Sequence, residues 1–137
     1  MFVGQRGKKR GFKGFTLVEL VIVLVILGVL VALAVPRFTT SAEKAKETTF
    51  CSNVRTIKSQ LELYRMQKGS YPSPTEFVSQ FLNNTEYFEN KPVNPYTDKP
   101  FGQDNPPSGQ NGYWDYTYDP SNGLYKLTTT PSCGMVQ

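Results

Sequence analysis

The chain has 137 residues, which is enough for one small domain and too short for a large enzyme. It has no histidine and two cysteines, Cys51 and Cys133, which lack the close spacing of a zinc or thioredoxin-like motif. The sequence contains no Gly-rich phosphate loop and no Ser or Cys paired with a candidate base. We therefore predict that the protein is not an enzyme.

The formal net charge of +4 is unevenly distributed along the chain. Of the 15 Lys and Arg residues, five precede residue 15, where no acid occurs, and the other ten stand against 11 Asp and Glu. A basic segment before an apolar one stays in the cytoplasm and directs the following chain outward. The charge therefore indicates membrane orientation and not nucleic-acid binding. The five residues are Arg6, Lys8, Lys9, Arg10 and Lys13.

The segment from Phe15 to Val35 is long and apolar enough to cross a bilayer, yet it contains one carboxylate, Glu19. A charge in the hydrocarbon costs about 2.5 to 3.5 kcal/mol on insertion scales, so Glu19 is a candidate functional residue. One interpretation is an ordinary secretory signal, cleaved after the "ALA" of Ala32–Ala34. Against it, the apolar run is longer than the usual signal core, and the helical pattern continues past that cut.

The segment after Pro36 has apolar residues at the spacing of one helical face, with charged residues between them. Gly69 stands where a C-terminal cap is expected, and Tyr71–Pro72 cannot continue a helix. We expect one helix from Phe15 to Lys68, about 80 Å long at a rise of about 1.5 Å per residue. The predicted core stripe is Phe38, Ala42, Ala45, Thr49, Phe50, Val54, Ile57, Leu61 and Tyr64.

The rest of the chain predicts a short helix, a loop and two strands. Ser73 is a candidate cap and Pro74 suits the first helical position, before apolar residues at helical spacing. Five prolines with Gly and Asn in residues 90–112 predict a loop. Residues 113–118 and 124–130 flank the turn sequence "DPSNG" and predict two strands. The expected fold class is α+β, with a long N-terminal helix packed against a short helix and a small antiparallel sheet.

The residues "KGFTLVEL", 13–20, resemble the N-terminal signature of type IV prepilins and pseudopilins. The likeness is close from Lys13 to about Phe38 and looser downstream, in architecture and in fragments such as "GSYP" and "NPYTDKPF". It implies a prepilin peptidase that cleaves between Gly14 and Phe15 and methylates the new amine of Phe15. It further implies the pilin lollipop fold, an assembly ATPase and an inner-membrane platform as partners, and self-association into a homopolymeric filament.

Two roles for Glu19 follow from such processing. Cleavage would create a positive amine on Phe15, one helical turn before Glu19, and a helix N-terminus itself favours a carboxylate. Glu19 then either neutralises the amine of its own chain or, as the resemblance implies, pairs with the Phe15 amine of a neighbouring subunit and sets the register of the filament.

Gly28 and Pro36 lie inside the apolar segment and predict a helix break, because both residue types disfavour a helix interior. They either kink a membrane helix or, as in resembling filaments, bound a segment that loses helical structure in the fibre. The two interpretations do not exclude each other.

The cysteines predict a disulfide between Cys51 and Cys133, which the chain-entropy model values at about 4 to 5 kcal/mol. The alternative is a buried free Cys51 and an exposed Cys133. The pairing departs from the common pilin pattern, in which both cysteines lie in the C-terminal half.

The resemblance raises calcium as a ligand, because major pseudopilins of type II secretion bind calcium in the C-terminal loop region. We expect the loop aspartates to be turn residues and solvated acids instead, and we predict no metal site and no other cofactor. The aspartates are Asp98, Asp104, Asp115 and Asp119.

An aromatic cluster at residues 113–118 could stack on nucleotide bases. Such clusters more often pack a sheet against a helix, and the neighbouring Asp115 and Asp119 have the wrong sign for a phosphate backbone. We expect no nucleic-acid partner. The cluster is Tyr113, Trp114, Tyr116 and Tyr118.

Together these features predict a structural subunit of a type IV pilus or pilus-like filament, assembled from the cytoplasmic membrane after leader cleavage. The alternatives are the major pseudopilin of type II protein secretion and a membrane-anchored or secreted binding domain that does not polymerise. The expected parts are a leader at 1–14, a transmembrane and filament-core helix at 15–36, and a globular domain at 37–137. That domain would lie outside a single-pass membrane anchor before assembly, and in a periplasmic or cell-surface filament afterwards.

Overall fold

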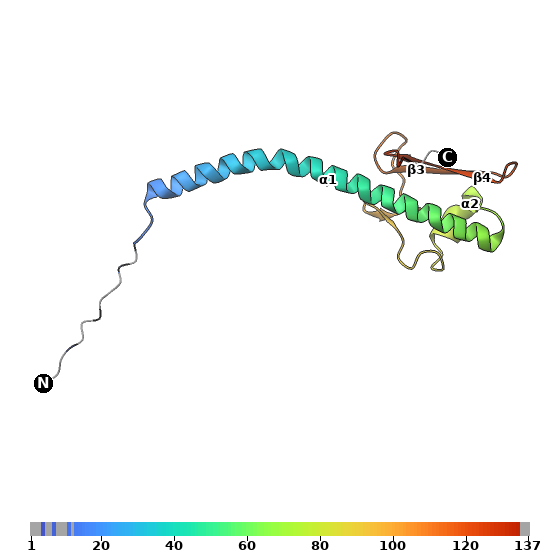
Figure 1. Ribbon diagram of the computed structural model, residues 1–137, viewed down its shortest axis with the longest axis horizontal. Coiled ribbons are helices and arrows are strands. Elements are labelled where there is room, and N and C mark those ends of the chain that lie inside the picture. Colours follow the sequence, from blue (N-terminus) through green and yellow to red (C-terminus); the bar gives the residue numbers. More distant parts are fainter. Residues whose placement is uncertain (1–3, 5–6, 8–10, 12, 135–137) are drawn as a thin grey trace. The chain divides into compact units, whose positions relative to one another are not determined.

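The computed structural model describes residues 4, 7, 11 and 13–134 (Figure 1). Its longest element is helix α1 (Leu17–Lys68), which starts slightly later than the predicted Phe15 and ends at the predicted residue. Gly69 terminates it with a φ of +85°, and the Gly69 N–H donates to the Arg65 carbonyl oxygen at 2.7 Å. Glycine adopts this left-handed conformation at no steric cost, which confirms the predicted C-terminal cap.

The chain divides into two compact units, residues 1–40 and 41–137. In the first unit the described part of α1 has no core around it. Phe15 is 84% exposed, and Phe38, which the helical pattern assigned to a core stripe, is 72% exposed. The stripe prediction is also wrong at Ala42, Ala45 and Thr49, which are exposed. The pattern is helical there, but no other described element packs on it.

The second unit has a core rich in aromatic side chains. Phe81 and Leu61 are fully buried, and Phe81 meets the ring of Tyr64 edge-on at 5.8 Å between centroids. The rings of Phe77 and Tyr116 stack at 4.0 Å. From α1 the core takes Phe50, Val54, Ile57, Leu61 and Tyr64; from the rest of the chain it takes Tyr71, Phe77, Phe81, Leu82, Tyr87, Phe88, Phe101, Trp114 and Tyr116.

The predicted short helix is present in two parts, α2 (Pro74–Glu76) and a π-helical turn η1 (Phe77–Leu82). The backbone N–H and the hydroxyl of Ser73 both donate to the Glu76 carboxylate, at 3.0 and 2.7 Å. These bonds hold the start of α2 and leave the apolar side of η1 facing the core.

The loop prediction for residues 90–112 is wrong in part, because two short strands, β1 (Val93–Asn94) and β2 (Lys99–Pro100), pair antiparallel within it. The fully buried Asn94 organises this hairpin. Its carbonyl oxygen accepts from the Thr97 and Asp98 N–H groups, and its side chain donates to the Gly112 carbonyl oxygen at 2.8 Å. A single residue, through its backbone carbonyl and its side chain, supplies bonds that the Pro-rich sequence pattern does not predict.

The two predicted strands are β3 (Tyr113–Asp119) and β4 (Leu124–Thr130), which form an antiparallel hairpin from Asp119↔Leu124 to Tyr113↔Thr130. Alternate residues of β3 face the core, including the buried Trp114 and Tyr116. With α1, α2 and η1, the two small sheets make the predicted α+β fold.

Candidate assembly site

Glu19 lies in the first turn of α1 and caps the helix of its own chain. Its Oε2 accepts a hydrogen bond from the Thr16 backbone N–H at 2.8 Å, and the Thr16 hydroxyl accepts one from the Glu19 N–H at 3.2 Å. This reciprocal pair is a capping box, which satisfies two donors that the first turn leaves without helical partners. The spacing of Thr16 and Glu19 is the sequence signal of that motif, and the sequence analysis missed it.

The residues around the predicted cleavage point are accessible. Gly14 and Phe15 are both exposed, and a Cβ added at Gly14 would meet no atom within 4 Å. No packing in the described structure therefore requires glycine at position 14. The basic residues Arg6, Lys8, Lys9 and Arg10 lie outside the described residues, whereas Lys13 is described and exposed.

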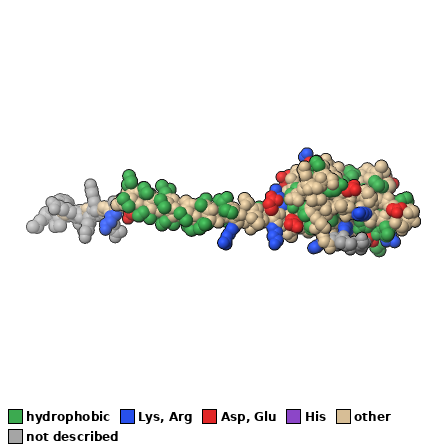
Figure 2. Space-filling view, turned by 90° about the horizontal axis from the view of Figure 1, so that it is seen from above, with side chains coloured by type: hydrophobic (Ala, Val, Ile, Leu, Met, Phe, Trp, Pro, Cys, Tyr) green, Lys and Arg blue, Asp and Glu red, His purple; other side chains and the backbone are tan. Residues whose placement is uncertain are grey.

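An apolar surface follows on α1, and α1 is long and apolar enough to cross a membrane. Figure 2 shows hydrophobic side chains over the face in view of this part of the helix. Leu24 is 68% exposed, Leu27 is 52% exposed and Leu33 is 68% exposed. A surface of this kind in a monomer marks an interaction site, because bare water is an unfavourable environment for it.

Gly28 and Pro36, the residues of the predicted helix break, both lie inside the continuous helix α1. Proline cannot donate the usual backbone bond. The hydroxyls of Thr39 and Thr40 both donate to the Pro36 carbonyl oxygen, at 2.9 and 3.2 Å. A Cβ at Gly28 would meet no atom within 4 Å, so neighbouring side chains do not demand a glycine there.

The structure brings Cys51 and Cys133 together in a disulfide, with Cα atoms 5.2 Å apart and a sequence separation of 82 residues. The bond ties α1 to the segment that follows β4, within the second unit. Both cysteines are half-buried beside the core.

The four loop aspartates do not converge on one point. Asp104 lies 3.4 Å from the Lys99 ammonium, and Asp119 accepts bonds from Ser121 and Asn122 in the turn between β3 and β4. These bonds lower the pKa of Asp119. Over the described residues, no group of three or more His, Cys, Asp or Glu side chains is placed to hold a metal ion. The described carboxylates form no such cluster, and we derive no metal site from them.

Two residues of the hairpin's aromatic cluster, Trp114 and Tyr116, belong to the core. Trp114 and Tyr116 are 8% and 6% exposed, so their faces are not available to stack on bases. The Tyr116 hydroxyl donates to the Pro72 carbonyl oxygen at 2.7 Å, and burial raises the Tyr116 pKa. The interpretation as a packing cluster agrees with this placement.

Two family models match consecutive parts of this chain. Residues 8–35 match the prokaryotic N-terminal methylation motif, and residues 37–130 match protein G of the type II secretion system. The chain belongs to the type II secretion protein G family. The methylation-motif model corresponds to the exposed apolar part of the helix, and the protein G model corresponds to the α+β second unit.

Curated members of the protein G family are similar to this chain over half of its length or more. The chain is 30% identical to the type II secretion system core protein G of Pseudomonas aeruginosa over 101 residues, 65% of this chain and 71% of that protein. It is 32% identical to that of Dickeya chrysanthemi over 96 residues, and 40% identical to that of Pectobacterium carotovorum over 70 residues. These matches cover 70% and 51% of this chain, and 58% and 44% of those relatives. No solved structure gives a significant match.

Proposed function

We propose that this chain is a subunit of a pseudopilus, the pilus-like filament of type II secretion, held in the cytoplasmic membrane by residues 15–36 until it is assembled. The observation that supports the proposal is a methylation motif followed directly by a protein G region. The helix that runs through the motif exposes its apolar side chains. Those side chains need lipid before assembly and neighbouring subunits afterwards. We assign the chain a structural role and no catalytic one.

Processing precedes assembly in this proposal. A prepilin peptidase removes residues 1–14 and methylates the amine of Phe15. Because the surroundings of Gly14 are open, the requirement for glycine at that position comes from the peptidase and not from folding. Residues 37–137 are then the globular domain outside the membrane, and an assembly ATPase with its membrane platform draws subunits into the filament.

Glu19 sets the register between subunits in this proposal. One carboxylate oxygen accepts from Thr16, which supports the start of the helix in the unprocessed chain. A carboxylate can accept from further donors, so the Phe15 amine of a neighbouring subunit can pair with it after processing. A subunit in the wrong register would leave a charge buried without its partner, which costs several kcal/mol.

Mass spectrometry of the mature chain tests the processing step. We expect the chain to begin at N-methylated Phe15. Gly14→Ala should retain the leader, whereas Gly11→Ala, a change at another exposed glycine with open surroundings, should be processed normally. A mature chain that begins at Val35 would instead establish an ordinary secretory signal.

A deletion strain tests the biological assignment. Loss of the protein should trap exported proteins in the periplasm and leave surface pili unchanged, and the wild-type gene should restore export. Loss of surface pili with export intact would assign the subunit to a type IV pilus and overturn the assignment to secretion.

A further inference from the structure

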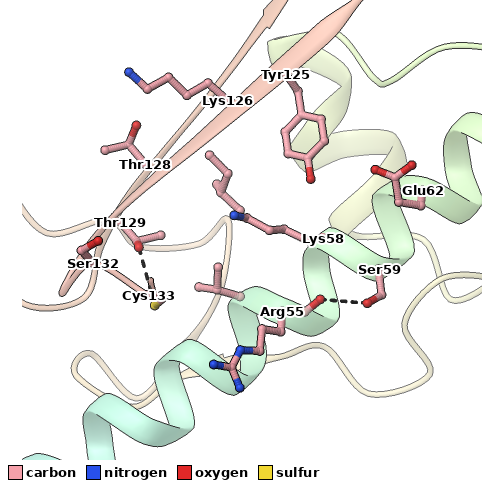
Figure 3. Close-up of a pocket in the computed structure, with 12 residues that line it drawn as sticks. Arg55, Lys58, Ser59, Glu62, Tyr125, Lys126, Thr128, Thr129, Ser132 and Cys133 are labelled. Carbon is pink, nitrogen blue, oxygen red and sulfur yellow. Dashed lines mark hydrogen bonds between the residues drawn. The ribbon is translucent and has the colours of Figure 1, made fainter. Parts of the chain in front are cut away.

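A groove of about 630 Å³ lies between α1 and β4, entirely within the second unit (Figure 3). Its helix side includes Arg55, Lys58 and Glu62. The close-up shows Lys58 pointing toward β4 and Glu62 beside Tyr125, whereas the Lys126 side chain extends from the other side of β4. Five consecutive residues of β4, 125–129, line it. Side chains alternate between the two faces of a strand. Consecutive residues that all line the groove therefore place it along the edge of β4 and not over one face alone.

The backbone of β4 is unpaired on that edge. The N–H and C=O of Trp114 bond to the side chain of Asn105, at 3.0 and 2.6 Å, so they point away from β4. Trp114 is opposite Thr129, which makes this a pair without mutual backbone bonds. Antiparallel pairs alternate in this respect, so the backbone groups of Tyr125, Leu127 and Thr129 point away from β3. Within residues 13–134, no other strand pairs with that edge.

The groove carries an excess of positive charge. Arg55 and Lys58 line it from α1, and neither is in a salt bridge with another described residue. The one acid on the lining, Glu62, already accepts a hydrogen bond from the Tyr71 hydroxyl at 2.7 Å. Half-buried Leu127 and buried Val54 supply an apolar floor. The lining therefore complements a segment that combines acidic and apolar side chains.

We propose that this groove binds an extended acidic segment of a partner protein, which adds to the hairpin as a third strand beside β4. Backbone hydrogen bonds to β4 would provide the pairing, apolar side chains would cover Leu127, and acidic side chains would meet Arg55 and Lys58. The proposal does not depend on filament assembly, because every residue involved lies in the second unit.

Fluorescence anisotropy with the full chain in a non-ionic detergent tests this proposal. The probe is a short labelled peptide that alternates Glu and Val and is blocked at both ends. We expect saturable binding that weakens with added salt. The same peptide with every backbone nitrogen methylated, or with Lys in place of Glu, should not bind. Equal binding of the N-methylated peptide, or no binding of the Glu–Val peptide, would overturn the strand pairing.

Two pairs of variants locate the binding. Lys58→Glu should weaken binding about 3- to 10-fold, as expected for reversing one charge contact, and Lys46→Glu, on an exposed part of the same helix outside the groove, should not. Leu127→Pro removes one outward N–H without removing a bond to β3, so it should abolish binding with the hairpin intact by circular dichroism. Leu127→Ala controls for the lost side chain and should retain backbone-dependent binding.

Equal effects of Lys58→Glu and Lys46→Glu would indicate general charge attraction and overturn the site. Light scattering of the chain alone distinguishes a different occupant. Self-association that Leu127→Pro abolishes would make a second copy of this chain the strand donor and overturn the partner segment.

Discussion

Leucines in the two parts of α1 have opposite surroundings. Leu24 and Leu27 are 68% and 52% exposed, whereas Leu61, on the same helix, is fully buried. Both parts are helical and apolar on at least one face, but only the second has aromatic side chains from η1 and the strands packed against it. Helical periodicity predicts the element, and the position of other elements decides which apolar residues form a core.

The difference suggests two uses for apolar side chains in one protein. Around residues 50–64 they stabilise the fold of a single chain. Around residues 17–38 the apolar side chains contribute nothing to the fold of the described monomer. Only lipid or other subunits can bury them. Substitutions in the two regions should therefore affect different measurements.

The largest expected effect is on assembly and comes from Glu19→Leu. The change removes a carboxylate whose presence in the bilayer costs about 2.5 to 3.5 kcal/mol, so insertion and the amount of processed protein should not fall. In the filament each Phe15 amine would lose its partner, so filament yield should collapse. Electron microscopy of sheared filaments, beside immunoblots of the membrane fraction, measures both quantities. Filaments of normal length built wholly from the variant would contradict the pairing between subunits.

Thr16→Ala is the control for the helix cap. It removes the hydroxyl that accepts from Glu19 N–H but keeps the carboxylate and the Thr16 backbone N–H. If the capping box were the whole role of Glu19, both variants would impair assembly alike. We expect Glu19→Leu to have the larger effect.

In the second unit, Phe81→Ala should lower the free energy of unfolding by about 3 to 5 kcal/mol, because it leaves a cavity among packed rings. Phe38→Ala is the matched control, since Phe38 is 72% exposed in the first unit and should change that free energy little. Chemical denaturation in detergent, followed by the fluorescence of Trp114, measures both. Equal losses would mean that the two regions do not differ as the structure indicates.

Removing the disulfide with Cys133→Ser should cost about 2 to 5 kcal/mol, because the bond closes a long loop in the unfolded chain. Denaturation of the wild type with and without reductant measures the same quantity independently. Reductant should have no further effect on the variant. Free reaction of both wild-type thiols with a labelling reagent in the folded protein would contradict the bond.

The smallest effect concerns Glu76, whose pKa is lowered from 4.5 because the Ser73 hydroxyl and backbone N–H donate to its carboxylate. A lowered pKa in the folded state means that the contribution is fully present above pH 4.5 and is lost as pH falls through the lowered value. Glu76→Gln should therefore be slightly less stable than wild type at neutral pH, and the difference should shrink in acid.

Sequence reasoning predicted the elements better than it predicted their surroundings. The end of α1 at Lys68 and both strands of the β3–β4 hairpin follow from local signals, a glycine cap and turn chemistry flanked by β-branched and aromatic residues. The β1–β2 pair was missed because the side chain of Asn94 organises it through bonds to a residue distant in sequence. The capping box at Thr16 was missed although its spacing is a known local signal.

The sequence by itself determined that an apolar, membrane-length helix carries one carboxylate after a basic segment, because hydropathy and charge are properties of the residues in order. It also determined the helical and strand periodicities and the family signature at residues 13–20. Only the tertiary structure decided that the core begins at Phe50 and not at Phe38, and that β4 lies beside Arg55 and Lys58 across a groove. Both depend on which segments distant in sequence pack together, and local periodicity contains no information about that choice.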